Sequence, residues 1–185
     1  MTIVDWKSGH KEPWHLLQLA FYTMGKHDPE IEFREKEHRY FYRDRELVSV
    51  TKLAGGTGKF YPHGSAERGH AVHKMVALYL QTILDEQWLD PLLTGYLAAL
   101  KKFLDGIEPY QVVTIEQVVG DPSLGFAGRV DAILDFKGGP PAMDVYLKTD
   151  GSFRTEPLVG ANFSWGRGKA HSLLAEHRQK ERLRI

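Results

Sequence analysis

A short apolar strand that carries two opposite charges constrains this chain most. Residues 3–9 are Ile-Val-Asp-Trp-Lys-Ser-Gly, with β-branched residues first and a Ser-Gly turn signal at the end. Because strand side chains alternate, Asp5 and Lys7 are expected on one face of this strand. A carboxylate and an ammonium group at the end of an apolar strand are costly to bury without a partner or a task. The pattern therefore predicts that this strand carries part of a functional site.

A helix is predicted directly after this strand, from Pro13 to about Met24. Proline suits the first turn of a helix, and the apolar residues that follow recur at helical spacing. Gln18 and Tyr22 are four residues apart, so they share one face of this helix.

Composition is that of an ordinary globular protein. The chain has 185 residues, no cysteine and a formal net charge of zero. Disulfides and thiolate metal sites are therefore excluded, and no large basic field for non-specific nucleic-acid binding is expected. No apolar run is long enough to span a membrane and no secretory signal is evident, so we expect a cytoplasmic protein with no membrane partner.

Two further strands are predicted to carry isolated acidic residues. The sequence Leu-Gly-Phe-Ala-Gly-Arg-Val-Asp, from residue 124, places Asp131 in an apolar stretch, and its glycines allow close backbone approach. A surface hairpin is the alternative for Asp131, which the flanking apolar residues disfavour. Glu116 interrupts a β-branched strand at residues 110–119, where a carboxylate needs a partner or a cation.

An amphipathic helix is predicted from Ser65 to Leu84, with Ser65 as its cap. It contains the sequence Arg-Gly-His-Ala-Val-His, which ends at His73. A partly buried structural histidine is the alternative interpretation of His73, and His70 is its nearest rival as a site residue.

Together these features resemble the PD-(D/E)XK nuclease superfamily, and more narrowly its RecB-like and phage exonuclease branch. The resemblance is carried by Asp-x-Lys at 5–7, Gln-x-x-x-Tyr at 18–22, Arg-Gly-x-x-x-His at 68–73, Glu116, and Gly-x-x-Gly-x-x-Asp at 125–131. It implies an α/β (α+β) fold with a restriction-endonuclease-like core, in which helices flank a central mixed sheet. Ordinary members have the Asp-x-Lys strand and the Gln-x-x-x-Tyr helix last. Here these two come first, so a circularly permuted core is expected.

The resemblance also implies an activity, cofactors and site residues. The activity is Mg²⁺- or Mn²⁺-dependent DNA hydrolysis, expected to be that of an exonuclease in DNA processing, recombination, repair or phage replication. The expected partners are DNA ends or single strands, and the expected setting is a bacterium, a phage-infected cell or an organelle. Lys7 would orient the water or stabilise charge on the phosphate. The residues implied are Asp5, Lys7, Asp131, Glu116, Gln18 and Tyr22 for catalysis, His73, Asp131, Asp5 and the backbone carbonyl of Trp6 for the metal, and Arg68, Lys59 and Arg129 for DNA.

One nuclease domain is expected over residues 1–185. Its parts are the strand and helix of residues 1–24, a hairpin over 31–51 with arms 31–42 and 46–50, the remaining core over 65–155, and a basic helix or tail over 165–185. Within these ranges we expect a flexible loop at 55–60, a scaffold helix at 91–104, an edge strand near 145–151, a loop at 160–168 and a basic helix at 170–184.

Other interpretations remain open at this stage. A nucleic-acid-binding module without catalysis would be expected to have lost Asp5, Lys7 or Asp131, and all three are present. A folded but inactive permuted chain, or a site completed by strand swapping between chains, are further alternatives. A zinc hydrolase using His10, His15, His70 and His73 lacks the required spacing. A single composite site requires the carboxylates of Asp5 and Asp131 to lie within about 5 Å of each other.

Overall fold

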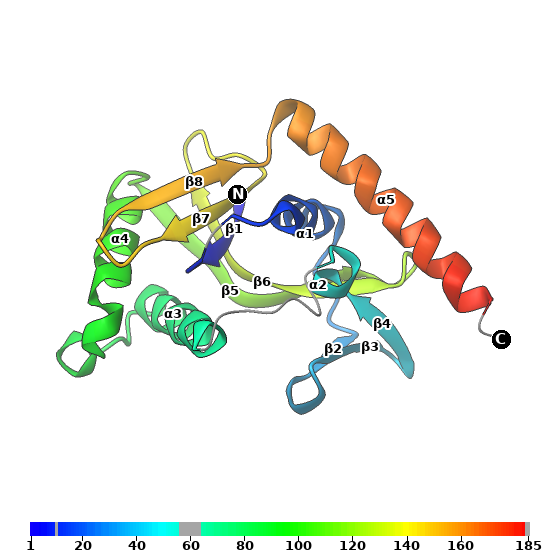
Figure 1. Ribbon diagram of the computed structural model, residues 1–185, viewed down its shortest axis with the longest axis horizontal. Coiled ribbons are helices and arrows are strands. Elements are labelled where there is room, and N and C mark those ends of the chain that lie inside the picture. The colour runs from blue at the N-terminus through cyan, green and yellow to red at the C-terminus, as the bar shows by residue number, and fades with distance from the viewer. Residues whose placement is uncertain (10, 56–63, 184–185) are drawn as a thin grey trace. The chain divides into compact units, whose positions relative to one another are not determined.

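The computed structural model describes residues 1–9, 11–55 and 64–183. Contacts divide the chain into two compact units, of which unit 1 comprises residues 1–11, 60–116 and 131–157, and unit 2 comprises residues 12–59, 117–130 and 158–185. Helices and both parallel and antiparallel strand pairs occur, which confirms the expected α+β class with a mixed sheet (Figure 1). None of the described helices is long and apolar enough to cross a membrane.

The sheet of unit 1 is built around β1 (Thr2–Lys7). On one side β1 pairs antiparallel with β6 (Phe126–Phe136), with Val4 opposite Ala132. On the other side it pairs parallel with β7 (Ala142–Leu147), which puts Asp5 opposite Asp144. The strand β8 (Phe153–Pro157) then pairs antiparallel with β7. A strand followed by a turn is present where the sequence predicts it, near residues 145–151. The predicted edge position is wrong, because β8 pairs with the outer side of β7 and β7 is buried along its whole length.

One face of this sheet packs on α3 (Ser65–Leu80) and α4 (Thr94–Asp105). Alternate residues of each strand enter this core, which is why the remaining residues of β1, β6 and β7 share the opposite face. That opposite face carries Asp5, Lys7, Asp131 and Asp144. The core residues of the sheet are Val4, Trp6, Ala132, Leu134, Met143, Val145 and Leu147.

The helices of unit 1 differ from the prediction at their ends. α3 begins at Ser65, but its N-cap is Gly64, which has a left-handed φ of 78°, so Ser65 is a helical residue and not the cap. The helix stops at Leu80 instead of Leu84, and Thr82 then takes a φ of 60°. The predicted helix at 91–104 is a 3-10 turn, η3 (Pro91–Leu93), followed by α4, and another such turn, η2 (Glu86–Trp88), precedes it.

Unit 2 combines helices with a small antiparallel sheet. α1 (Pro13–Met24) has the bounds that the sequence predicts. The predicted hairpin is wrong in its first arm, because η1 (Glu35–Glu37) and a left-handed residue at His38 fold that arm into two strands. The described strands are β2 (Ile31–Arg34), β3 (Arg39–Tyr42) and β4 (Arg45–Ser49), with β4 followed by α2 (Val50–Leu53) and paired with the first residues of β6. β5 (Tyr110–Asp121) pairs with β6, and both strands run from one unit into the other.

The long helix α5 (Gly160–Arg182) completes unit 2. The predicted loop at residues 160–168 is therefore wrong. Glycines weaken the intrinsic helix preference of this stretch, but packing of α5 on α1 outweighs that preference. Gly166 favours this packing, since a Cβ added there would lie 3.1 Å from Cβ of Ala20 on α1.

Gly128 on β6 is expected to tolerate no side chain. A Cβ added there would lie 2.7 Å from Cε1 of Tyr22 and 2.9 Å from Cγ2 of Val50. Gly128→Ala should therefore lower the free energy of unfolding by about 1–3 kcal/mol, measured by urea denaturation. Gly168→Ala is the control, because a Cβ there meets nothing within 4 Å and alanine favours a helix, so stability should rise by up to about 1 kcal/mol. Equal changes in the free energy of unfolding for the two substitutions would contradict this close packing at Gly128.

Candidate functional site

Asp5 and Lys7 form a buried ion pair on β1. Asp5 is 3% exposed, and Lys7 Nζ donates to Asp5 Oδ2 at 2.7 Å. The two residues are two positions apart, so strand alternation places them on one face, as the sequence predicts. Each charge offsets part of the cost of burying the other.

Asp131 lies on β6 beside this pair. The antiparallel ladder of β1 and β6 ends at Val4 opposite Ala132, and Asp5 and Asp131 are the next residues along the two strands. The two carboxyl groups are joined by a hydrogen bond, and the Trp6 N–H donates to Asp131 Oδ2 at 2.8 Å. Two hydrogen-bonded carboxyl groups meet the limit of about 5 Å that a shared ion sets.

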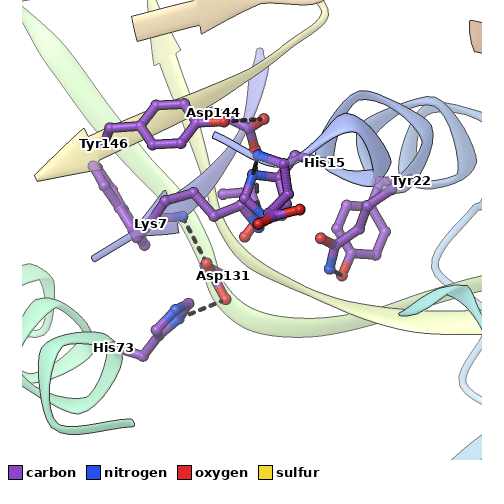
Figure 2. A network of polar contacts seen from close by, with 11 residues as sticks. Lys7, His15, Tyr22, His73, Asp131, Asp144 and Tyr146 are labelled. Carbon is purple, nitrogen blue, oxygen red and sulfur yellow. Dashed lines mark hydrogen bonds and ion pairs between the residues drawn. The ribbon is translucent and has the colours of Figure 1, made fainter. Parts of the chain in front are cut away.

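His73 reaches Asp131 from α3 (Figure 2). Its Nδ1 lies 3.2 Å from Asp131 Oδ1, and its side chain is 33% exposed. The negative charge of Asp131 raises the pKa of His73 to about 9, so the imidazole is protonated at neutral pH in the metal-free protein. His70 is exposed, and it is His73 that contacts the carboxylate.

The pKa values of the Asp5 and Asp131 carboxyl groups are shifted in opposite directions. Burial raises the pKa of Asp5 well above its usual value, more than Lys7 lowers it, and the charge of Asp131 adds to the rise. Although burial acts against it, the charge of His73 holds the pKa of Asp131 below its usual range. The pair is therefore expected to share one proton, carried on Asp5. Burial disfavours charge on Lys7, but Asp5 and Asp144 raise its pKa above the ordinary value, so it stays charged.

Asp144 lies beside Asp5 and Lys7, and the sequence analysis did not single it out. It is directly opposite Asp5 in the ladder and 0% exposed. Its Oδ1 lies 3.9 Å from Lys7 Nζ, and Tyr146 Oη donates to its Oδ2 at 3.5 Å (Figure 2). Burial raises the pKa of Asp144 to about 6. The available signal was a carboxylate between apolar neighbours, the same pattern that drew attention to Glu116.

The other predicted site residues lie at several further places in the chain. Gln18 and Tyr22 belong to unit 2, where Gln18 Nε2 donates to Tyr22 Oη at 2.8 Å. Glu116 is half-buried on β5, with a left-handed φ of 54°. The roles of these three residues stay predictions. The guanidinium carbon of Arg129, in unit 2, lies 4.9 Å from the ring of Phe33. Arg68 is exposed on α3, and His15 is on α1. Three further predictions lie outside the described residues: Lys59, His10 and residues 56–60 of the predicted loop.

The donor atoms suit a hard divalent cation. Asp5 and Asp131 supply carboxylate oxygens, and the carbonyl of Trp6 points to the same edge of β1 as its N–H, which contacts Asp131. Over the described ranges, no three His, Cys, Asp or Glu side chains are arranged to hold a metal ion. Mg²⁺ is commonly held by one or two carboxylates while water completes its octahedron, so the residues present fit Mg²⁺ or Mn²⁺ without a third side chain.

The ion pair of His73 and Asp131 is expected to make the stability of the metal-free protein depend on pH. Folding raises the pKa of His73 from 6.5 to about 9, so the stabilisation is complete below pH 6.5 and is lost as the pH rises through 9. His73→Gln should therefore cost about 1–2 kcal/mol at about pH 6, after allowance for partial exposure, and far less at about pH 10. Urea denaturation in EDTA measures this difference, with His70→Gln as the exposed control. A cost that is equal at both pH values would contradict the ion pair.

No protein-family model matches this chain, and no curated protein matches it. The interpretation of the site therefore depends on the residues and geometry described above.

Proposed function

We propose that this protein is a Mg²⁺- or Mn²⁺-dependent deoxyribonuclease that hydrolyses phosphodiester bonds as an exonuclease. The observation that carries the proposal is the hydrogen-bonded pair of Asp5 and Asp131 on antiparallel neighbouring strands, with Lys7 and His73 against it. Paired carboxylates supply hard oxygen ligands, and the adjacent ammonium group supplies fixed positive charge. Phosphodiester hydrolysis needs both.

Each side chain of the pair has a distinct task in this proposal. A bound Mg²⁺ or Mn²⁺ would activate a water molecule and neutralise charge on the phosphate. Asp5, Asp131 and the Trp6 carbonyl would hold the ion, after Asp5 has released the proton that it shares with Asp131. Lys7 remains charged and stabilises the negative charge that develops on the phosphate. His73 orients Asp131 through Nδ1, and it becomes a ligand only after losing its own proton.

The fold proposed is a circularly permuted PD-(D/E)XK core. In ordinary members of this superfamily the strand with the aspartate and the Asp-x-Lys strand are consecutive. Here β6 and β1 are far apart in the sequence and still pair antiparallel, which supports the same spatial arrangement with a different chain order. Permutation is physically allowed because the packed elements, and not their order along the chain, define a fold.

Cleavage of end-labelled linear single- and double-stranded DNA tests the proposal. The assay compares Mg²⁺, Mn²⁺ and chelator, with Asp131→Ala, purified in the same way, as the control for contaminating nucleases. Metal-dependent digestion that the variant lacks is the expected result, and the product ladder then gives the polarity. DNA binding by the folded protein without cleavage would overturn the proposal in favour of a non-catalytic module. A folded protein that shows no DNA binding and no cleavage would indicate an inactive permuted chain.

Lys7→Met is expected to separate catalysis from metal binding. It removes the positive charge and keeps most of the apolar side chain, so the cleavage rate should fall by about 10²–10³-fold. Because Lys7 is not a ligand, the affinity for Mn²⁺ measured by calorimetry should not decrease. Lys101→Met is the control, since the Lys101 side chain is 39% exposed and pairs with Glu86. A variant that loses Mn²⁺ affinity but not rate would assign Lys7 to the metal site instead.

A further inference from the structure

Charge is divided unevenly between the two units, although the net charge of the chain is zero. Unit 2 contains 15 lysine and arginine residues against 11 aspartate and glutamate residues, and unit 1 contains 9 against 13. Residues 158–185 hold the whole excess of unit 2, and most of this segment is the helix α5. The basic residues of α5 are Arg167, Lys169, Arg178, Lys180 and Arg182, against the two glutamates Glu176 and Glu181.

These five basic side chains have no carboxylate partner. None of them forms an ion pair in the part of the chain that the structure describes. Arg178 Nη2 donates to the carbonyl oxygen of Ser123 at 2.9 Å, and the guanidinium carbon of Arg167 lies 5.6 Å from the ring centre of Phe163. Neither contact neutralises the positive charge.

The arginines on the small sheet of the same unit are different. Three of them each have a nitrogen within 3.2 Å of a glutamate oxygen, in the pairs Arg34–Glu32, Arg39–Glu46 and Arg43–Glu30. A cation that already faces a carboxylate attracts a further anion less strongly. Unpaired positive charge in unit 2 is therefore concentrated on α5.

Packing determines which side of α5 faces outward. Its buried residues, Gly166, Ala170 and Leu174, are four apart and form one stripe, and the helix packs on α1. All five basic side chains are exposed. The helix dipole favours cations only in the last turn, so it does not account for Arg167 and Lys169 near the middle of the helix.

The extended row of cations fits a polyanion with regularly spaced charges. Fifteen residues separate Arg167 from Arg182, which corresponds to about 22 Å along the helix. Trp165, on the same helix, is 55% exposed and offers a ring on which an unpaired base can stack. An anionic membrane fits less well, because a helix on a membrane buries its apolar stripe in lipid, and the apolar stripe of α5 is already buried.

We propose that the exposed side of α5 binds the phosphate backbone of DNA independently of base sequence. The surface goes beyond the proposed site, since none of its residues has a task in the proposed chemistry. The choice of DNA among polyanions rests on the proposed function. Each cation that contacts a phosphate displaces counterions from the DNA, so the affinity should depend steeply on salt concentration.

Fluorescence anisotropy of labelled single-stranded DNA tests this inference with the full chain in EDTA, so that no cleavage takes place. The triple variant Arg167→Gln, Lys169→Gln and Lys180→Gln should bind about 10²-fold more weakly at about 0.1 M salt. The slope of log affinity against log salt concentration should become shallower by about 2. The substituted side chains are exposed, so the melting temperature, followed by circular dichroism, should stay close to that of the wild type.

The matched control removes the same number of positive charges from the same unit. It replaces three exposed arginines that already pair with glutamates, as Arg34→Gln, Arg39→Gln and Arg43→Gln. Its affinity should stay within about threefold of the wild type, and its salt slope should not change. Equal losses in the two triple variants would show that net charge alone determines binding, and this result would overturn the inference.

Further outcomes separate this inference from the proposed function. An α5 variant that binds DNA like the wild type, but no longer binds vesicles containing anionic phospholipid, would assign the helix to a membrane surface and overturn the inference. DNA binding that depends on α5 in a protein that cleaves no DNA would support the inference and overturn the proposed function. Metal-dependent cleavage by a protein whose DNA affinity does not depend on α5 would do the reverse.

Discussion

Replacing Asp131 with asparagine is expected to reduce metal-dependent DNA cleavage by at least about 10³-fold, equivalent to about 4 kcal/mol of transition-state stabilisation. Asparagine keeps an oxygen that can accept the Trp6 N–H, so the strand should remain in place. It removes the negative charge that faces Asp5 and His73, and with it one of the two carboxylates proposed to bind the ion. The measurement is the initial rate on end-labelled DNA in saturating Mn²⁺, together with Mn²⁺ titration.

Asp135→Asn is the matched control for this experiment. Asp135 lies on the same strand four residues later, where its side chain is 56% exposed and pairs with the N-terminal amine. Its rate should stay within about twofold of the wild type, because an exposed ion pair contributes little. Equal rate losses in both variants would show that a general charge effect, and not the position of Asp131, determines activity.

Replacing Trp6 with alanine is expected to lower the free energy of unfolding by about 3–5 kcal/mol. Trp6 is 1% exposed and packs edge-to-face on Phe103, with ring centroids 5.5 Å apart. Trp6→Phe should cost much less, about 1–2 kcal/mol. The indole Nε1 has no hydrogen-bond partner in the described ranges, so the substitution to phenylalanine removes no such bond. Chemical denaturation of both variants measures the difference.

The same pair of variants tests the link between core and site. Trp6 points into the core while its neighbours Asp5 and Lys7 point to the other face, so the tryptophan fixes the strand that carries them. Trp6→Ala should therefore reduce cleavage below what its folded fraction explains, and Trp6→Phe should not. Similar stability losses in the two variants would indicate that the cavity closes and that the indole is not an anchor.

The sequence predicted best those features that depend on local periodicity. Alternation alone placed Asp5 and Lys7 on one face of β1, and helical spacing gave both bounds of α1. The contact of Asp131 with Asp5 is different, because it depends on the register between two strands that are distant in the sequence. Only the family resemblance suggested that contact. A local pattern carries no information about it.

The features that the sequence analysis missed depend on packing between distant elements. β7 is buried on both faces, so it has no polar and apolar alternation that would mark Asp144 as facing a site. α5 contains glycines that disfavour a helix in isolation, and its first turns form where they pack on α1. In both cases tertiary contacts outweighed the local preference of the residues.

The position of β1 has a consequence for how the chain reaches its folded state. Residues 2–4 pair with residues 132–134, and residues 3–7 pair with residues 142–146. Both edges of β1 therefore pair with strands that are distant in the sequence. Closing such long loops is entropically costly and slows folding, during which an apolar strand with two open edges is prone to associate with other chains. Charged residues on such a strand oppose this association. We therefore expect Asp5 and Lys7 to oppose aggregation of the newly made chain, in addition to the role proposed for them in the folded protein.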